Sequence, residues 1–349
     1  MSRVGTMKIH LVGVHQYPGR FGGLASTRVA DCLAKGLAEL GHQVSYELPS
    51  TFVGSLPDGV QLVHKRRFDV DIMWFNGFAG GTLPTTRGIP WLRTPHGYDK
   101  SWTPHLRDNW MFVSASHAAF FGRERYVRNA IDPSEFCYGE PKDDYFLFMV
   151  ADLCQLERKG FQIARELVRR CGIGLVVAGA ISEDGMAERY ERMFAQDGIR
   201  HVGHVSGREK AELLARARAL LFPTQVNEPF GLGIAEAMMS GTPVICSDRG
   251  ACPELVRPET GFICSTFEEY VSALDGVDRL SPLACRIFAL ENYHYLRMAR
   301  DYLAEFEQEI VNWESPAWRA KVGEYWRWVD VDLRGRRLLV GVPRSYLPG

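Results

Sequence analysis

The sequence predicts an α/β fold of two doubly wound, Rossmann-like domains that face each other across a cleft. Short apolar runs alternate with amphipathic helical stretches from residue 8 to residue 310. A polar segment with Pro and Gly, residues 137–144, interrupts this alternation once, and a chain of 349 residues is long enough for about two domains. Hydrophobic residues make up 46% and charged residues 24%, which excludes a disordered or fibrous chain.

The first domain is expected over residues 7–137. Residues 8–14 predict a buried strand, and a Gly-rich turn leads to a helix over 24–42 that Gly41 ends. Further strands are predicted at 43–48, 71–76, 89–95, 111–116 and 126–131. Strands that alternate with helices are typical of a mostly parallel sheet covered on both faces.

The same pattern restarts in a second domain, expected over residues 144–290. It predicts strands at 145–151, 174–180, 219–224 and 242–247, and helices near 160–171, 184–196, 207–217 and 231–240. Open α/β sheets bind ligands at the carboxyl ends of their strands, so both domains are expected to present loops to the cleft. Residues 291–312 predict a closing helix, and residues 313–349 form a Trp-rich tail without an assigned role.

The charge and the cysteine content indicate which binding partners and which cellular compartment are expected. The 41 Lys and Arg against 42 Asp and Glu leave a net charge of −1, which provides no electrostatic attraction for nucleic acid. The eight cysteines have no Cys-x-x-Cys spacing and are interpreted as buried residues in a reducing compartment. The start of the chain lacks the features of a signal peptide and no run suggests a membrane span, so we expect a cytoplasmic protein. The basic run 65–67 allows at most peripheral contact with the inner membrane face.

Residues 222–256 carry the clearest chemical signal. They predict a strand, a loop with Glu228, a helix that opens at Phe230-Gly231-Leu232 and contains Glu236, and another strand. The free N–H groups and positive dipole end of such a helix suit a diphosphate, and Gly231 lets the backbone approach it closely. The two carboxylates can flank that site and accept hydrogen bonds from sugar hydroxyls. Spacing alone equally allows a helix that only packs, with both glutamates capping or solvated.

The chain resembles retaining glycosyltransferase family 4. Residues 227–256 are similar to the diagnostic segment of that family, and the resemblance continues in order along residues 7–310 through FGGLASTRVADCLAKGLAELGHQV, TPHGYD, FVSAS, VRNAIDPSEF, RKGF and LVVAGA. It implies the GT-B fold, with C-terminal helices that cross back. It also implies transfer of a sugar from a UDP- or GDP-sugar to a hydroxyl of a glycan, lipid-linked or small-molecule acceptor. No cofactor and no obligatory metal are expected.

The resemblance also implies roles for individual residues. The catalytic residues would be Glu228, which contacts donor hydroxyls, His96 near the anomeric carbon, and Lys159, which neutralises the departing diphosphate. The substrate-binding residues would be Phe230, Gly231 and Leu232 through their backbone N–H groups, Glu236 at the ribose, and Gly22 and Gly23 in a loop over the phosphate.

Two positions depart from the family pattern. Asp152 stands where the family usually has an arginine, and a carboxylate close to a phosphate opposes its binding. Either Asp152 points away from the donor, or Arg158 or Arg20 offsets its charge, or the enzyme is weak or altered. Ala251 replaces a common glycine, which concerns local loop geometry.

Two other functions fit the same sequence: a sugar-nucleotide epimerase of the same fold, and a catalytically silent nucleotide-sugar-binding protein. Metal binding is not expected at the two Asp-x-Asp sequences, because Asp69 and Asp71 lead into a strand and Asp330 and Asp332 lie in the tail. His201 and His204 have no cluster of ligands beside them in the sequence.

Overall fold

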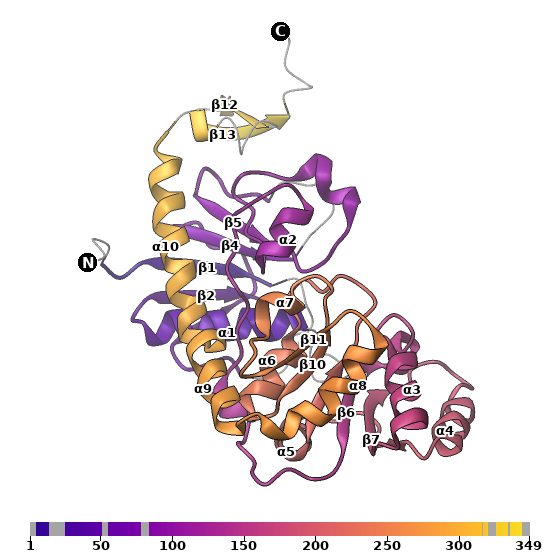
Figure 1. Ribbon diagram of the computed structural model, residues 1–349. Coiled ribbons are helices and arrows are strands. Elements are labelled where there is room, and N and C mark those ends of the chain that lie inside the picture. Colours follow the sequence, from indigo (N-terminus) through magenta and orange to yellow (C-terminus); the bar gives the residue numbers. More distant parts are fainter. Residues whose placement is uncertain are drawn as a thin grey trace.

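The computed structural model describes residues 5–13, 25–50, 55–77, 84–315, 317–319, 326–333 and 336–343. Its main body consists of two parallel sheets, each covered by helices, which confirms the predicted α/β fold of two Rossmann-like units (Figure 1). No helix among these residues is long and apolar enough to cross a membrane.

The first unit is built on a five-stranded sheet in the order β3-β2-β1-β4-β5. Its strands are β1 (Lys8–Val12), β2 (Gln43–Glu47), β3 (Val60–Val63), β4 (Ile72–Asn76) and β5 (Trp91–Thr94). Helix α1 (Ala25–Glu39) packs on one face through its buried apolar positions, among them Val29, Leu33 and Leu37. Because all the strands of this sheet are parallel, their carboxyl ends lie at one edge. Helix α1 begins at this edge, where Asn76 at the end of β4 donates a hydrogen bond to the Ser26 carbonyl.

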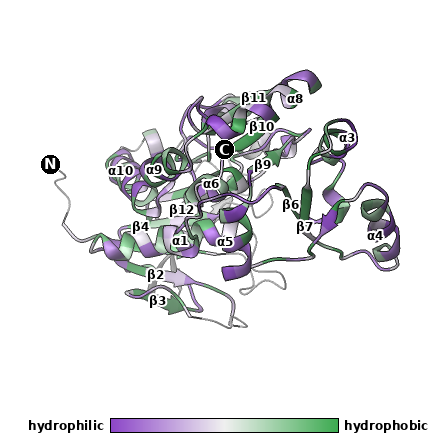
Figure 2. Ribbon diagram, turned by 60° about the horizontal axis from the view of Figure 1, so that its bottom comes forward, coloured by the Kyte–Doolittle hydropathy of each residue, from purple (hydrophilic) through white to green (hydrophobic). Residues whose placement is uncertain are grey.

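The second unit has a six-stranded sheet in the order β11-β10-β9-β6-β7-β8. The strands are β6 (Phe146–Asp152), β7 (Leu175–Ala180), β8 (Arg200–His201), β9 (Ala219–Phe222), β10 (Val244–Ser247) and β11 (Gly261–Cys264). The helices are α3 (Phe161–Cys171), α4 (Ala187–Gln196), α5 (Gly207–Arg216), α6 (Leu232–Met239), α7 (Cys252–Leu255) and α8 (Phe267–Gly276). The inner strands β6 and β7 are largely hydrophobic, as expected for strands covered on both faces (Figure 2).

Two C-terminal helices return the chain to the first unit. Helix α9 (Pro282–Tyr293) packs on α6, and α10 (Tyr295–Trp313) lies along α1, where its buried residues join the core of the first unit (Figure 1). The Tyr302 hydroxyl of α10 lies 2.8 Å from Thr94 Oγ1 at the end of β5. Beyond α10, β12 (Trp326–Leu333) and β13 (Arg336–Pro343) form an antiparallel pair.

The strands predicted at 111–116 and 126–131 are wrong. These segments contribute isolated bridges, Phe112 with Tyr126 and Ile131 with His294, instead of a ladder. The reason is local: the Ser114 side chain accepts a hydrogen bond from the His117 N–H and caps α2 (Ala115–Phe120), which ends the extended segment. The apolar run 111–113 is buried in the first unit all the same.

Candidate active site

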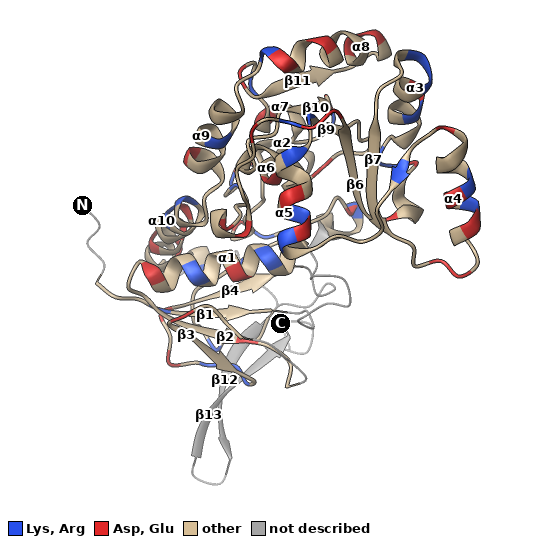
Figure 3. Ribbon diagram, turned by 90° about the horizontal axis from the view of Figure 1, so that it is seen from below, with Lys and Arg blue, Asp and Glu red and all other residues tan. Residues whose placement is uncertain are grey.

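A cleft of about 1330 Å³ separates the two units. The first unit lines it mainly with α1, and the second with the ends of β6 and β9, Lys159 just before α3, part of α5 and the first turns of α6. Both α1 and α5 carry basic and acidic residues in close alternation (Figure 3). The predicted site residues Lys159, Glu228, Gly231, Leu232 and Glu236 all line this cleft.

Glu228 lies in the loop after β9 and is buried, with an exposed fraction of 8%. Its Oε1 accepts hydrogen bonds from Lys159 Nζ and from the Thr224 hydroxyl at 3.3 Å. Its backbone carbonyl accepts from the Ala251 N–H at 2.9 Å and from the Tyr98 hydroxyl at 3.2 Å. The loop is thus held from both units, and Ala251, the second position noted above, is fully buried beside it.

A close backbone approach brings Lys159 to Glu228. Gly160, which follows Lys159 and starts α3, has a φ of 76°, and a Cβ there would lie 1.9 Å from the Pro223 carbonyl oxygen. Glycine is required at this point, so that the start of α3 can touch the end of β9. Lys159 Nζ also lies 5.7 Å from the centre of the Phe222 ring. The structure therefore brings together two residues that stand 69 positions apart in the sequence.

The N-terminus of α6 opens into the cleft next to Glu228. Gly231 caps the helix in the left-handed region, with a φ of 99°. Phe230 is buried edge-on against Tyr293, at 5.9 Å between ring centres, and Ser114 of the first unit donates a hydrogen bond to the Pro229 carbonyl at 2.6 Å. These contacts fix the turn at the start of α6, where Gly231 and Leu232 line the cleft but Phe230 does not.

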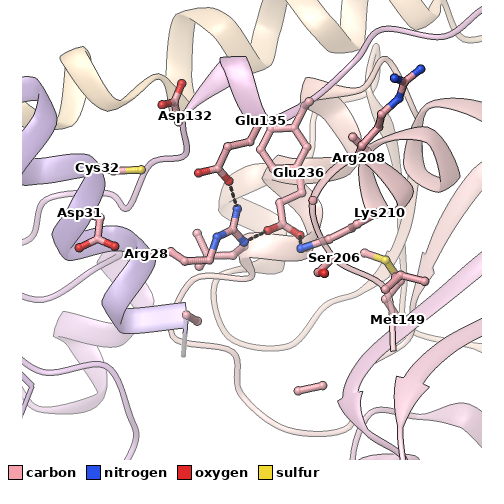
Figure 4. Close-up of a pocket in the computed structure, with 18 of the residues that line it drawn as sticks. Arg28, Asp31, Cys32, Asp132, Glu135, Met149, Ser206, Arg208, Lys210 and Glu236 are labelled. Atoms are coloured by element: carbon pink, nitrogen blue, oxygen red, sulfur yellow. Dashed lines mark hydrogen bonds and ion pairs between the residues drawn. The ribbon is translucent and has the colours of Figure 1, made fainter. Parts of the chain in front are cut away.

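Glu236 is more deeply buried, with an exposed fraction of 3%. Its carboxylate forms ion pairs with Arg28 of α1 and with Lys210 of α5, the latter at 2.7 Å (Figure 4). Burial alone would raise the pKa of Glu236, but the charges of Lys210 and Arg28 outweigh it and hold the pKa below its usual range. Glu236 is thus an ionised acceptor on the wall of the cleft.

The described residues that line the cleft do not include the predicted residues His96, Gly22 and Gly23. The His96 ring lies 2.7 Å, Nε2 to Oδ1, from the buried Asn76, whose amide nitrogen donates to the Ser26 carbonyl at the start of α1. His96 is not among the described residues that line the cleft. Gly22, Gly23 and Arg20 lie outside the described residues.

Asp152 turns its carboxylate to backbone N–H groups. Its Oδ1 accepts from the Cys154 N–H at 2.8 Å and its Oδ2 from the Ser182 N–H at 3.0 Å, so it caps the short 3₁₀ helix Leu153–Gln155. Burial would raise the pKa of Asp152, and these hydrogen bonds lower it overall. Neither Asp152 nor the exposed Arg158 lines the cleft. The Asp152 carboxylate is thus held by backbone groups outside the lining of the cleft.

The Asp-x-Asp sequence of the first unit is engaged in structural contacts. Asp69 pairs with Arg67 at 2.6 Å, and Asp71 accepts a hydrogen bond from the Lys8 N–H at 2.7 Å. Asp330 and Asp332 lie on β12. In the part of the chain that the structure describes, no three His, Cys, Asp or Glu residues are grouped to hold a metal ion.

Sequence reasoning missed the residues that reach the site from elsewhere. Arg28 and Lys210 are ordinary helix positions in the sequence, and Tyr98 and Ser114 contact the Glu228 loop through its carbonyl groups. The TPHGYD and FVSAS segments contain Tyr98 and Ser114, but nothing in the sequence indicates which atoms they touch.

Comparison with known proteins finds a family similarity that includes most of the second unit. Residues 132–281 match the family model of glycosyl transferases group 1. The matched segment is less than half of the 349 residues, and these residues are similar to group 1 glycosyl transferases. The chain is 34% identical over 131 residues to the MMP alpha-(1->4)-mannosyltransferase of Mycolicibacterium hassiacum, a match that covers 36% of this chain and 30% of that protein. The chain thus spans about a third of the length of this relative.

Solved structures of other proteins resemble the fold of both units. AviGT4, a glycosyltransferase involved in avilamycin A biosynthesis, superposes with a TM-score of 0.72 at 22% identity, covering 87% of this chain and 98% of AviGT4. Anabaena Alr3699/HepE, solved in complex with UDP-glucose, superposes with a TM-score of 0.65 at 14% identity, covering 86% of this chain and all of HepE. These likenesses show that the two units adopt the GT-B arrangement.

Proposed function

We propose that this protein is a retaining glycosyltransferase of family 4, which moves a sugar from a UDP- or GDP-sugar to a hydroxyl of a glycan, lipid-linked or small-molecule acceptor. One observation carries the proposal. The Lys159–Glu228 ion pair, the open N-terminus of α6 and the buried carboxylate of Glu236 line one wall of a single cleft.

The three features match the three parts of a nucleotide-sugar donor. Glu236 accepts hydrogen bonds from the ribose hydroxyls, and the N–H groups at Phe230, Gly231 and Leu232 receive the diphosphate. Glu228 contacts the hydroxyls of the sugar. HepE supports this assignment of the cleft, because its structure holds UDP-glucose and has the same fold.

In the proposed reaction the bond from the anomeric carbon to the diphosphate oxygen breaks, and a bond from the anomeric carbon to the acceptor oxygen forms on the same face. The acceptor proton passes to the departing diphosphate. Lys159 and the α6 N–H groups stabilise the negative charge that develops there, and closure of the two units would exclude water from the reaction. Glu228 positions the sugar and stabilises its positive charge without forming a covalent bond.

His96, Gly22 and Gly23 complete the proposed site from the first unit. His96 is held by Asn76 at 2.7 Å, a contact that fixes its ring relative to the start of α1. We assign His96 to the region of the anomeric carbon and O6, and Gly22 and Gly23 to the loop that closes over the phosphate.

The positive charge for this chemistry is assigned to Lys159 and the helix N-terminus, so that no metal and no cofactor is required. A direct check is to assay transfer after treatment with EDTA. We expect an unchanged rate, and a rate that falls and returns on addition of Mn²⁺ or Mg²⁺ contradicts this part of the proposal. A cytoplasmic location, with at most peripheral contact at the inner membrane face, stays a prediction.

The proposal is tested with a panel of labelled UDP- and GDP-sugars and a mixture of hydroxyl-bearing acceptors. Transfer with retained anomeric configuration is expected for at least one donor. An epimerase would convert the nucleotide sugar without any acceptor, and a silent binding protein would bind donor without transfer or hydrolysis. The named relatives are transferases, which favours transfer over both alternatives.

A further inference from the structure

An arginine of the first unit reaches across the cleft to the buried carboxylate of Glu236. The guanidinium of Arg28 on α1 bonds Glu236 Oε1 through one terminal nitrogen and Glu135 Oε2, at 2.6 Å, through the other (Figure 4). Lys210 Nζ lies 2.7 Å from the second oxygen of Glu236. Each oxygen of this carboxylate is therefore held by a cation, and the two cations come from different units.

This arrangement orients the carboxylate and leaves it free to accept more hydrogen bonds. An ionised carboxylate offers about four acceptor positions, so Arg28 and Lys210 leave about two unused. Glu236 lines the same cleft as Gly231 and Leu232 at the start of its helix. Two adjacent hydroxyl groups are the donors that match this remaining capacity.

Arg28 is itself fixed in place. Its guanidinium lies between Glu236 and Glu135 and 6.0 Å from the centre of the Phe136 ring. Burial alone would lower the pKa of Arg28, but the charges of Glu236 and Glu135 outweigh it and raise the pKa above its usual value. Without Arg28, Oε1 of Glu236 loses its charged donor and Lys210 alone holds the carboxylate.

We propose that Arg28 is a positioning residue of the donor site, which orients Glu236 from across the cleft to receive the two hydroxyls of a nucleotide ribose. This inference rests on the proposed function, since it takes the ribose of a nucleoside diphosphate as the ligand. The ribose site is then complete only when α1 of the first unit stands against α6 of the second. Binding of the nucleoside is then coupled to closure of the two units.

Another cation of α1 offers a matched control. Lys35 lines the same cleft about two turns further along α1. It pairs with Asp132 at 2.6 Å instead of with Glu236. Substitution of Lys35 removes the same charge from the same helix but leaves the donors of Glu236 in place.

The test measures the affinity of the full-length protein for UDP, GDP and their 2′,3′-dideoxy forms by calorimetry. The wild type is expected to prefer the ribose form by about tenfold or more, as for hydroxyls bonded to a charged group. Arg28→Met is expected to reduce this preference to about twofold or less, with little change in affinity for the dideoxy form. Arg28→Lys restores part of the preference, and Lys35→Met retains all of it. Arg28→Gln serves the same comparison if Arg28→Met does not fold.

Each other outcome overturns the proposal. Equal loss of affinity for both forms in Arg28→Met means that Arg28 acts on the phosphates, and tighter binding of the ribose form means that it competes with ribose. An unchanged preference removes it from the site. In these three cases nucleoside diphosphates still bind and the proposed function stands. If the wild type binds none of them, both proposals fail.

Discussion

Lys159 and Glu228 form an ion pair at the wall of the interdomain cleft, although one precedes α3 and the other follows β9. Glu228 is buried, and its carboxylate also accepts a hydrogen bond from the Thr224 hydroxyl. The lysine therefore offsets the charge of the glutamate. A bound diphosphate would provide a competing anion for Lys159, which frees Glu228 to contact the sugar.

We expect Glu228→Gln to lower the rate of transfer by about 100-fold or more, because the variant keeps the shape of the side chain but loses the negative charge. Steady-state rates with a labelled donor measure the loss, and the melting curve shows whether the fold is kept. The control is Glu259→Gln, an exposed position of the same unit that does not line the cleft. Transfer at the normal rate in Glu228→Gln would remove this carboxylate from the site.

Lys159→Met tests the stabilisation of the leaving group. We expect kcat to fall by about 100-fold with a smaller rise in the donor KM, since the charge on the diphosphate grows in the transition state. The adjacent Arg158 is exposed and does not line the cleft, so Arg158→Met is expected to stay within about twofold of the wild type. The reverse result would assign the diphosphate to Arg158 instead.

Asp152 is expected to contribute to stability and not to transfer. Asp152→Ala removes the acceptor for the Cys154 and Ser182 N–H groups and is expected to lower the free energy of unfolding by about 0.5–2 kcal/mol. Urea denaturation measures this loss, and Asp152→Asn, which keeps one acceptor oxygen, should lose less. If either variant transfers sugar several times faster than the wild type, the carboxylate does oppose the diphosphate.

Asp31 predicts a pH dependence of stability. It lines the cleft from α1, and burial raises its pKa to about 7 despite a hydrogen bond from Tyr46. Because the folded state favours the protonated carboxyl, its contribution to stability is complete below about pH 4 and is lost as the pH rises to about 7. Asp31→Asn stays neutral throughout.

We therefore expect Asp31→Asn to become more stable relative to the wild type as the pH rises. The difference between their free energies of unfolding should change by about 2 kcal/mol from pH 4 to pH 7, a figure that allows for the part of the side chain that reaches solvent. Denaturation curves at several pH values measure the difference. Asp58→Asn, at an exposed position of the same cleft, is the control. A difference that stays constant with pH contradicts the raised pKa of Asp31.

The sequence by itself determined the alternation of strands and helices, the two units and the helix that opens at Gly231. These features follow from local periodicity and from glycines, which act over a few residues. The strands expected at 111–116 and 126–131 failed for the same reason, because apolar content indicates burial but not whether a segment finds a partner long enough for a ladder.

The tertiary structure decided how the site is assembled. Sequence spacing placed Glu228 before the helix and Glu236 inside it, but it left open whether either carboxylate was buried and which cations faced it. Arg28 meets Glu236 across 208 residues of sequence, and Tyr98 meets the Glu228 carbonyl across 130. Such pairs depend on how two separately folded sheets stand against each other, and α10 fixes that arrangement by returning from the second unit to pack on α1.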